Sequence, residues 1–454
     1  MAAIQFLAAA LFLAAPPART AAQESSAVRL GVLQTGPYTM VERSDWSRYD
    51  NGKYTGHVYH EVRASIKPEP ADSGGAAESS ETPGSGAFLY QGNFFVMEET
   101  LRDMRASARP VDAIIPVSFK VFRDGNMVLK EDNGYPALRG FPAFPRESVK
   151  PGTRWTAQGQ KAADPKHTGK PVLIPFTAEY EYRGPELYQE IPVHRVRAAY
   201  ALRYRGGGFT ENFSTLTGTH TVDILIQAAN GLPLFIRDNL DETYAWPDGS
   251  TLRFRGFTLV FNQGTAPVNR ETVIASLGNS LGITGQKEPE PPPAAPPAAP
   301  PNPGPAESGG PAPGQLRGNS LQEARETNPE KGLELVAVPE GVRLIIRDIR
   351  FVPDSDEFLP EERPRLDAIT QALRRAAPNQ SFLVEGHTAS TGRPGGEMEL
   401  SLRRARRMVD ELARRDIAAD RFIYKGWGGT RPVGDNNTEE GRNLNRRVEI
   451  TILD

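Results

Sequence analysis

The residues best placed to bind a ligand lie between Phe382 and Arg407, in the stretch FLVEGHTASTGRPGGEMELSLRRARR. Alternation predicts a strand that ends at Gly386, and a glycine-rich loop follows it. A helix is predicted from about Glu397, because apolar residues recur at alternating four- and three-residue spacing. These apolar residues are Met398, Leu402, Ala405, Val409 and Leu412. Loop N–H groups and a helix N-terminus would then face one pocket edge, which suits an anion such as a carboxylate.

The charged side chains of this stretch have two interpretations each. From spacing alone, the arginines at 403, 404, 406 and 407 are typical of a solvated helix face. As a ligand contact, Arg404 would offer a planar fork of donors that pairs with a carboxylate through two hydrogen bonds. Glu397 falls in the first helical turn, where the helix dipole favours a carboxylate. It is either a helix-start acid or an anion that pairs with a ligand amine.

Three separated motifs resemble the OmpA C-terminal-like family over about residues 331–454. They are Gly386-His387-Thr388, the run Leu400-Ser401-x-x-Arg404-Ala405, and EGRNLNRRVEI from Glu440 to Ile450. The resemblance implies a peptidoglycan-binding domain, in which the arginine matching Arg404 and an aspartate after Gly-His-Thr hold the diamino acid of the stem peptide. This sequence has Ala389 at the aspartate position. It also has Glu397 where the family usually has asparagine.

The predicted ligand-binding residues follow from these motifs. They are Arg404, Thr388, Ala389, Ser390, Glu397, Asn445 and Arg446. The hydroxyl of Thr388 and the N–H groups of Ala389 and Ser390 can hydrogen-bond a ligand without charge, while Glu397, or Glu399 nearby, would replace the lost acid. A buried Asn445 would fix loop backbone near the pocket, together with Arg446.

Other polar residues are given structural roles. His387 is predicted to be a loop histidine with satisfied hydrogen bonds, and Arg442 and Arg447 to form surface ion pairs. His57 and His60 fall on a predicted strand, where positions three apart point to opposite faces, so they do not predict a metal site. No catalytic residue, metal ligand or cofactor is predicted, because the sequence contains no serine elbow, cysteine nucleophile or phosphate loop.

Composition and the first residues indicate an exported protein with more than one domain. It has 454 residues, a net charge of −3 and 38% hydrophobic residues, which suits two or more domains and gives no sign of a nucleic-acid partner. Residues 1–22 read as a secretory signal, since their apolar run is short and small residues precede Gln23. Because the sequence has no cysteine, we expect no disulfides and no lipidated cysteine. We therefore expect export, and the resemblance to the OmpA C-terminal-like family implies the periplasm or outer membrane of a diderm bacterium.

The predicted fold class is multidomain: a mostly antiparallel β domain, then a small α/β domain of βαβαβ type. The β-rich domain covers 23–265, with a disordered insertion at about 67–86. A linker rich in proline and alanine covers 266–330, and the OmpA-like domain covers 331–454. Because few contacts cross such a linker, the two folded parts are predicted to be independent. One short helix is expected within 262–286, and the final domain is expected to be a mixed sheet with helices on one face.

The β-rich domain shows regular strand patterns from Val28 to Phe261, with arginines on one face of 194–205 and apolar residues on the other. It resembles weakly the half-barrel or β-clam domains of periplasmic lipid-carrying proteins, in which Pro-Gly-x-x-Trp and Gly-Leu-Pro elements recur. No function follows from that likeness.

Two classes of function fit the whole sequence. In the first, the OmpA-like domain binds peptidoglycan non-covalently and tethers or organises the outer membrane and periplasm, with outer-membrane or other envelope proteins as further partners. In the second, the protein is a structural or interaction protein whose OmpA-like fold has lost peptidoglycan binding, as Ala389 permits. A variant of the first makes the β-rich domain an outer-membrane β-barrel.

Overall fold

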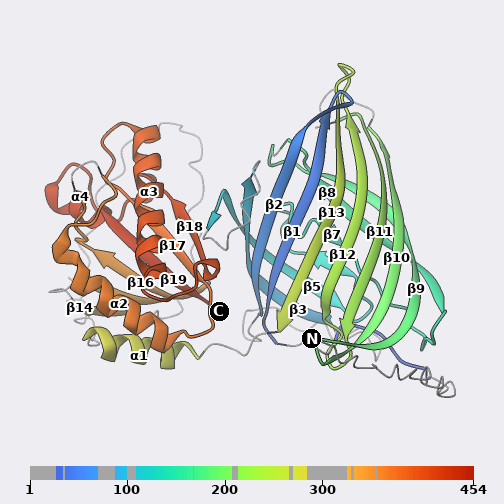
Figure 1. Cartoon of the computed structure of the whole chain (residues 1–454), viewed down its shortest axis with the longest axis horizontal. Helices are drawn as coiled ribbons and strands as arrows, with labels where there is room; N and C mark the ends of the chain where they lie inside the picture. Colours follow the sequence, from blue (N-terminus) through green and yellow to red (C-terminus); the bar gives the residue numbers. More distant parts are fainter. Residues whose placement is uncertain are drawn as a thin grey trace, which may run out of the picture.

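The computed structural model describes residues 27–33, 36–69, 87–99, 109–166, 168–206, 213–264, 269–283, 325–328, 332–352 and 355–454. These residues form two β-sheets and four α-helices (Figure 1). The predicted signal segment 1–22, most of the insertion at 67–86 and the proline-rich stretch 288–314 lie outside the described residues. Within the described part of the chain, every helix is too short or too polar to cross a membrane.

The larger sheet has twelve strands and is built from the first half of the chain. In spatial order they are β6 (Met127–Leu129), β5 (Ala113–Phe122), β3 (Ala87–Glu99), β2 (Lys53–Pro68), β1 (Tyr38–Asp50), β13 (Thr251–Gly264), β12 (Pro233–Ala245), β11 (Thr215–Gln227), β10 (Ile191–Arg205), β9 (Val172–Tyr188), β8 (Arg154–Ala163) and β7 (Leu138–Arg139). Neighbouring strands are antiparallel, as predicted. The sheet curls round on itself until it is nearly barrel-shaped (Figure 1).

Alternation along the strands separates a buried inner face from a charged outer face. On β10, Val196, Ala198 and Leu202 are buried, whereas Arg197 and Arg203 are exposed. The predicted two-sided pattern is therefore confirmed on this strand. Phe144 is buried and Trp155 packs against the same core, so the segment 141–155 places aromatic side chains inside.

Two residues of β2 depart from the alternation of its sequence. Tyr54 is in phase with the buried Val58 and Val62 but is 49% exposed, because it lies next to the tight turn that joins β1 to β2. Glu61 is charged and in phase with the exposed His57, yet it is fully buried. Its carboxylate accepts hydrogen bonds from Arg43 and Arg63, and Arg63 also donates to the carbonyl of Asp420 in the second domain. Domain packing therefore covers this part of the outer face.

The smaller sheet has seven strands and carries the helices. In spatial order its strands are β14 (Arg325–Asn328), β15 (Leu333–Val338), β16 (Gly341–Arg347), β19 (Arg447–Leu453), β17 (Phe382–His387), β18 (Phe422–Gly426) and β4 (Arg109–Pro110). The helices are α1 (Arg270–Leu281), α2 (Arg363–Ala376), α3 (Pro394–Ala413) and α4 (Glu439–Asn445). β17 and β18 are parallel, and β19 runs antiparallel between β16 and β17. This order confirms the predicted mixed sheet.

Helix α3 begins earlier and buries a different stripe than predicted. It starts at Pro394, so the glycines at 395 and 396 are helical and not part of the loop. Met398 is 40% exposed, and the buried stripe runs through Ser401, Ala405, Met408, Val409 and Leu412. Spacing alone therefore misplaces Met398.

The helix expected within 262–286 is present as α1, and it belongs to the smaller domain. Its N-cap Asn269 accepts a hydrogen bond from the N–H of Thr272, and Gly282 ends it in the left-handed conformation. Val273, Ile274, Leu277 and Leu281 are buried in the core that also contains α2 and α3. Part of 266–330 therefore packs against the domain that follows it.

The two domains also contact each other directly. A shared cluster contains Phe95, Met97 and Val111 from the first domain and Leu383, Ile423 and Leu453 from the second. The short strand β4 pairs with β18, and the ammonium of Lys425 donates to the carbonyls of Val111 and Asp112 at 2.9 and 2.7 Å. These contacts were not anticipated from the linker.

Candidate functional site

The candidate site lies where the parallel strands β17 and β18 end and α3 begins. Two glycines allow the helix to approach these strand ends closely. A Cβ on Gly386 would lie 2.2 Å from the carbonyl oxygen of Ser401, and one on Gly426 would lie 2.5 Å from the N–H nitrogen of Leu402. The hydroxyl of Ser401 in turn accepts the N–H of Gly428. The Gly-His-Thr and Leu-Ser motifs therefore fit together as one packing unit.

The loop after β17 is held by the loop that precedes α4. The N–H of Thr388 donates to the carbonyl of Gly428, and the N–H of Ser390 donates to Asn436 Oδ1, both at 3.0 Å. Ala389 between them is only 5% exposed, and the buried hydroxyl oxygen of Thr388 has no hydrogen-bond partner in the described part of the protein. The N–H of Ser390, predicted for a ligand, is thus already engaged.

Asn445 connects α4 to the same region. Its Oδ1 accepts the N–H groups of Val433 and Gly434 at 2.7 and 2.9 Å, and its Nδ2 donates to Asn436 Oδ1 at 2.9 Å. The side chain is 1% exposed. Asn445 therefore fixes loop backbone as predicted. Asn436, which accepts its hydrogen bond, also accepts the N–H of Ser390 and so links the two segments.

Glu397 closes the start of α3. Its Oε1 accepts hydrogen bonds from the N–H and hydroxyl of Thr391 and from the N–H of Arg393. Burial alone would raise the pKa of Glu397, but these hydrogen bonds outweigh burial and lower the pKa. The geometry matches the helix-start interpretation, since the carboxylate already stabilises the loop that enters the helix.

Arg404 is anchored by a different loop, between β16 and α2. Its Nε donates to the carbonyl of Ser355 at 3.2 Å, and its guanidinium carbon lies 4.5 Å from the ring centre of Phe351. Phe351 stacks on Phe358 at a centroid distance of 4.5 Å. The guanidinium thus packs against an aromatic ring, and a planar guanidinium can form two parallel hydrogen bonds to a carboxylate.

The arginines near α4 divide into an exposed and a buried group. Arg446 pairs with Glu439 at 2.7 Å on the surface of α4, and Arg442 pairs with the same carboxylate. The surface ion pair predicted for Arg442 is therefore observed. The same prediction for Arg447 is wrong: Arg447 is 5% exposed and its Nε lies 2.6 Å from Glu449 Oε1. It faces the helix-free side of the sheet, which the sequence pattern does not mark as covered.

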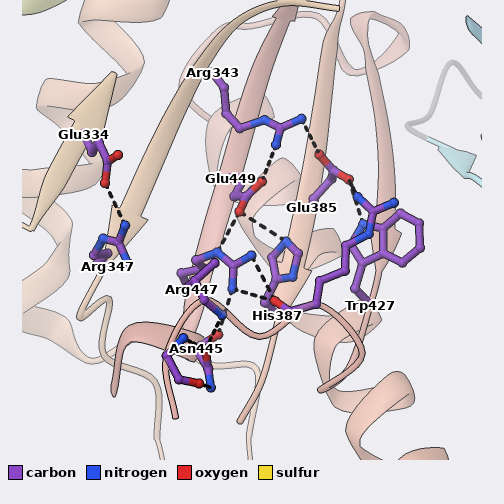
Figure 2. A network of polar contacts seen from close by, with 12 residues as sticks. Glu334, Arg343, Arg347, Glu385, His387, Trp427, Asn445, Arg447 and Glu449 are labelled. Atoms are coloured by element: carbon purple, nitrogen blue, oxygen red, sulfur yellow. Dashed lines mark hydrogen bonds and ion pairs between the residues drawn. The ribbon is translucent and has the colours of Figure 1, made fainter. Parts of the chain in front are cut away.

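The helix-free side of the smaller sheet carries a network of charged side chains (Figure 2). Arg343 lies 3.0 Å from Glu449 and 3.6 Å from Glu385, and the indole N–H of Trp427 donates to Glu385 at 2.7 Å. Burial raises the pKa of Glu385. For Glu449, burial would raise the pKa, but the positive charges around it prevail and lower it.

His387 lies inside this network and differs from its prediction. It is 3% exposed, and neither ring nitrogen has a hydrogen-bond partner among the described residues, so it is not a satisfied loop histidine. Its Nε2 is 3.6 Å from Glu449 Oε1. Burial lowers the pKa of His387 to about 3, and the nearby arginines contribute in the same direction. His387 is therefore neutral at physiological pH.

The structure brings Thr388, Ala389, Ser390 and Asn445 together around the loop before α4. Arg404, on α3, instead packs against the loop between β16 and α2. Sequence reasoning missed Asn436, which accepts hydrogen bonds from two of these segments. The signal available was the run Asp435-Asn436-Asn437 directly before the N-cap Thr438, since asparagine side chains often bind backbone in such turns.

His57 is mostly exposed and His60 is buried, so the two histidines do point to opposite faces of β2.

The candidate site thus consists of the start of α3 and two loops at the ends of the parallel strands β17 and β18, in a small α/β domain. Residues 350–446 match the OmpA family. The outer-membrane lipoprotein YfiB of Pseudomonas aeruginosa is 32% identical over 136 residues, which cover 27% of this chain and 80% of that protein. The chain belongs to the OmpA family.

Other relatives share only part of their length with this chain. The peptidoglycan-binding protein ArfA of Mycobacterium tuberculosis is 35% identical over 104 residues, which cover 23% of this chain and 32% of ArfA. The chain thus spans about a third of the length of that relative. The solved structure of the cell wall anchor of the T6SS from Pseudomonas aeruginosa has 32% identity, covers 28% of this chain and 90% of the anchor, and gives a TM-score of 0.25.

Proposed function

We propose that the OmpA-like domain binds the peptidoglycan stem peptide non-covalently, and that the protein thereby tethers or organises the cell envelope. The observation that carries the proposal is the position of Arg404. Its guanidinium is fixed by Ser355 and by the ring of Phe351, so little conformational entropy is lost when a carboxylate binds it. The names of the relatives support the same ligand, since ArfA is described as peptidoglycan-binding.

The remaining binding residues are proposed to act around Arg404. The hydroxyl of Thr388 is buried and without a partner among the described residues, so it is suited to a neutral hydrogen bond with the ligand. Ser390 and Asn445 hold the shape of the loop, while Glu397 holds the start of α3. We assign Arg446 a surface role, since Glu439 already engages it.

We infer a binding protein of the envelope, without a catalytic role, whose further partners are outer-membrane or envelope proteins. Relatives include proteins named outer membrane porin F and outer-membrane lipoprotein. The alternative of a membrane-inserted β-rich domain is less well supported, because the outward faces of β9 and β10 carry charged residues. Exposed examples are Glu179, Arg183, Arg197, Arg203 and Arg205. Such side chains are costly against lipid.

The test is a pull-down of the full chain with purified sacculi that contain either diaminopimelate or ornithine. Arg404→Ala should reduce the bound fraction at fixed sacculus concentration, corresponding to about a tenfold weaker affinity, since a charge-assisted hydrogen bond is lost. Arg403→Ala is the matched control, because Arg403 is the neighbour of Arg404 on α3, is exposed, and forms a surface ion pair with Glu399. Failure of the unaltered chain to bind either kind of sacculus would favour the structural alternative.

A further inference from the structure

The twelve-stranded sheet encloses a cavity that the proposed peptidoglycan site does not use. Its volume is 940 Å³, within the range of sites that hold whole organic ligands. Aromatic and aliphatic side chains make most of its wall. They include Tyr38, Met40, Phe94, Phe119, Trp246 and Phe254. A wall of this kind favours an elongated apolar molecule, because each methylene group that leaves water contributes about 0.8 kcal/mol.

A cluster of charged side chains contributes the polar part of the wall. Lys161 pairs with Glu242, and the imidazole of His220 lies 3.0 Å from Glu242 and 2.8 Å from Asp238. Tyr200 and Tyr244 donate hydroxyl hydrogen bonds to Asp238 and Glu242, at 3.2 and 2.7 Å. Glu242 is therefore engaged through both of its oxygens, whereas Asp238 is engaged through Oδ2 and its Oδ1 has no hydrogen-bond partner among the described residues.

Glu42 on β1 is the exception among the acids of the cavity. Its side chain lines the cavity, yet it makes neither a hydrogen bond nor an ion pair with the described residues. Burial raises the pKa of Glu42 to about 7; the charge of Lys161 lowers it and that of Asp238 raises it. With Glu42 ionised, this cluster contains three carboxylates, those of Glu42, Asp238 and Glu242, and two cations, Lys161 and His220. One negative charge then has no counter-ion.

We propose that this cavity binds a long-chain amphiphile whose polar end carries an ammonium group. The hydrocarbon chain lies along the aromatic and aliphatic wall, and the ammonium pairs with Glu42. An ammonium group supplies both the missing positive charge and hydrogen-bond donors, whereas a carboxylate headgroup would add a fourth negative charge to the same space. A hydroxyl headgroup would donate a hydrogen bond to Glu42 but would leave its negative charge without a counter-ion.

Three probes of equal chain length distinguish these headgroups: dodecylammonium, 1-dodecanol and laurate. Each competes with the fluorophore N-phenyl-1-naphthylamine for the full chain, at concentrations below micelle formation. We expect dodecylammonium to displace the fluorophore at about a tenfold lower concentration than dodecanol, as a charge-assisted hydrogen bond predicts. Laurate should bind most weakly.

The variant Glu42→Gln keeps the shape of the side chain and should make dodecylammonium no better than dodecanol. Glu179→Gln is the control, since Glu179 lies on the exposed face of β9 and should change nothing. Far-ultraviolet circular dichroism and fluorophore binding together report whether the variant is folded with an open cavity. The proposal is overturned if none of the probes displaces the fluorophore, if laurate binds best, or if Glu42→Gln leaves the preference for the amine intact. Arg404→Ala should not affect this binding, so the result is independent of sacculus binding.

Discussion

The side chain of Asn445 donates a hydrogen bond to Asn436 Oδ1 at 2.9 Å, and that oxygen also accepts the N–H of Ser390. One amide oxygen thus joins α4 to the loop that follows β17. Because Asn445 is almost fully buried, the constraint is shielded from water and is stronger than a surface contact. The shape of the candidate site therefore depends on a residue that need not touch the ligand.

Replacing Asn445 by alanine should destabilise this region. The N–H groups of Val433 and Gly434 would lose their acceptor, at a cost of about 0.5–1.5 kcal/mol for each hydrogen bond, because both residues are at least partly exposed. Hydrogen exchange of the amides in 433–436 and 388–390 should accelerate together. Asn443→Ala on the same short helix is the control, since Asn443 is exposed and its loss should cost less than about 0.5 kcal/mol.

Glu397→Ala should lower the stability of the smaller domain more than it lowers the affinity for sacculi. The change removes the acceptor for the N–H groups of Thr391 and Arg393, at a cost of about 1–2 kcal/mol. Urea unfolding followed by hydrogen exchange of α3 would measure it. Glu399→Ala is the matched control, because Glu399 is exposed and its ion pair with Arg403 lies on the surface of α3. Unchanged stability with lost sacculus binding would instead show that the carboxylate serves the ligand.

The sequence predicts the smaller domain well because local patterns and motifs agree there. Leu366, Ile369 and Leu373 face the core as their spacing requires, and α2 ends before Pro378. The start of α3 could not be predicted, since Gly395 and Gly396 disfavour a helix and only the packing of Glu397 against the loop reveals it.

Predictions fail where tertiary contacts or function override the pattern. The sequence of β1 does not alternate between apolar and polar residues as a half-buried strand would. Three of its inward-facing positions, Glu42, Arg48 and Asp50, are charged and line the cavity. Glu61 and Arg447 are charged and therefore read as exposed, yet both are buried and paired. Asn436 was missed because its role depends on two segments that are distant in sequence.

His387 should make the smaller domain less stable as the pH falls. Its pKa is lowered from 6.5 to about 3, so below pH 6.5 the unfolded chain binds a proton that the folded protein excludes. Stability should fall by up to about 1.4 kcal/mol per pH unit as the pH decreases from 6.5. The pKa of Glu449 is lowered from 4.5, so its own loss of stability begins at lower pH.

Hydrogen exchange of the β17 amides between pH 6.5 and 4.5, corrected for intrinsic rates, isolates the contribution of His387. His387→Phe should flatten the dependence in this window. His57→Phe, at an exposed histidine of β2, should leave it unchanged. A slope that persists in His387→Phe would assign the effect to another group.

Cleavage of the chain within 284–324 should leave the two products associated. The proline-rich composition of this stretch predicts protease access, but α1 would remain on the first fragment and is packed into the core of the second. Size-exclusion chromatography should show one peak that contains both fragments. Leu277→Asp should weaken the association, whereas Ala275→Asp, at an exposed position of α1, should not. Separation of the unaltered fragments would restore the prediction of independent domains.

Ala389→Asp should change which stem peptide the protein prefers. The family pairs an aspartate with arginine to hold a diamino acid, and Ala389 removes the anionic partner while Arg404 remains. A diaminopimelate peptide has an amine and a carboxylate at its far end, so it loses one charge-assisted hydrogen bond here, worth about 1.5–3 kcal/mol or a factor of about 10–150 in affinity. An ornithine peptide lacks the far carboxylate and should be less sensitive to the loss of the pair.

Calorimetric titration of the full chain with both peptides would measure the preference. Ala389→Asp should strengthen diaminopimelate binding more than ornithine binding, and Ala389→Asn should not, because it adds a similar shape without charge. Since Ala389 is 5% exposed, an introduced aspartate needs the ligand amine as a partner and should destabilise the ligand-free protein. Thermal unfolding with and without peptide would detect this coupling. An equal gain in affinity for both peptides, or no gain, would mean that position 389 does not determine which diamino acid is preferred.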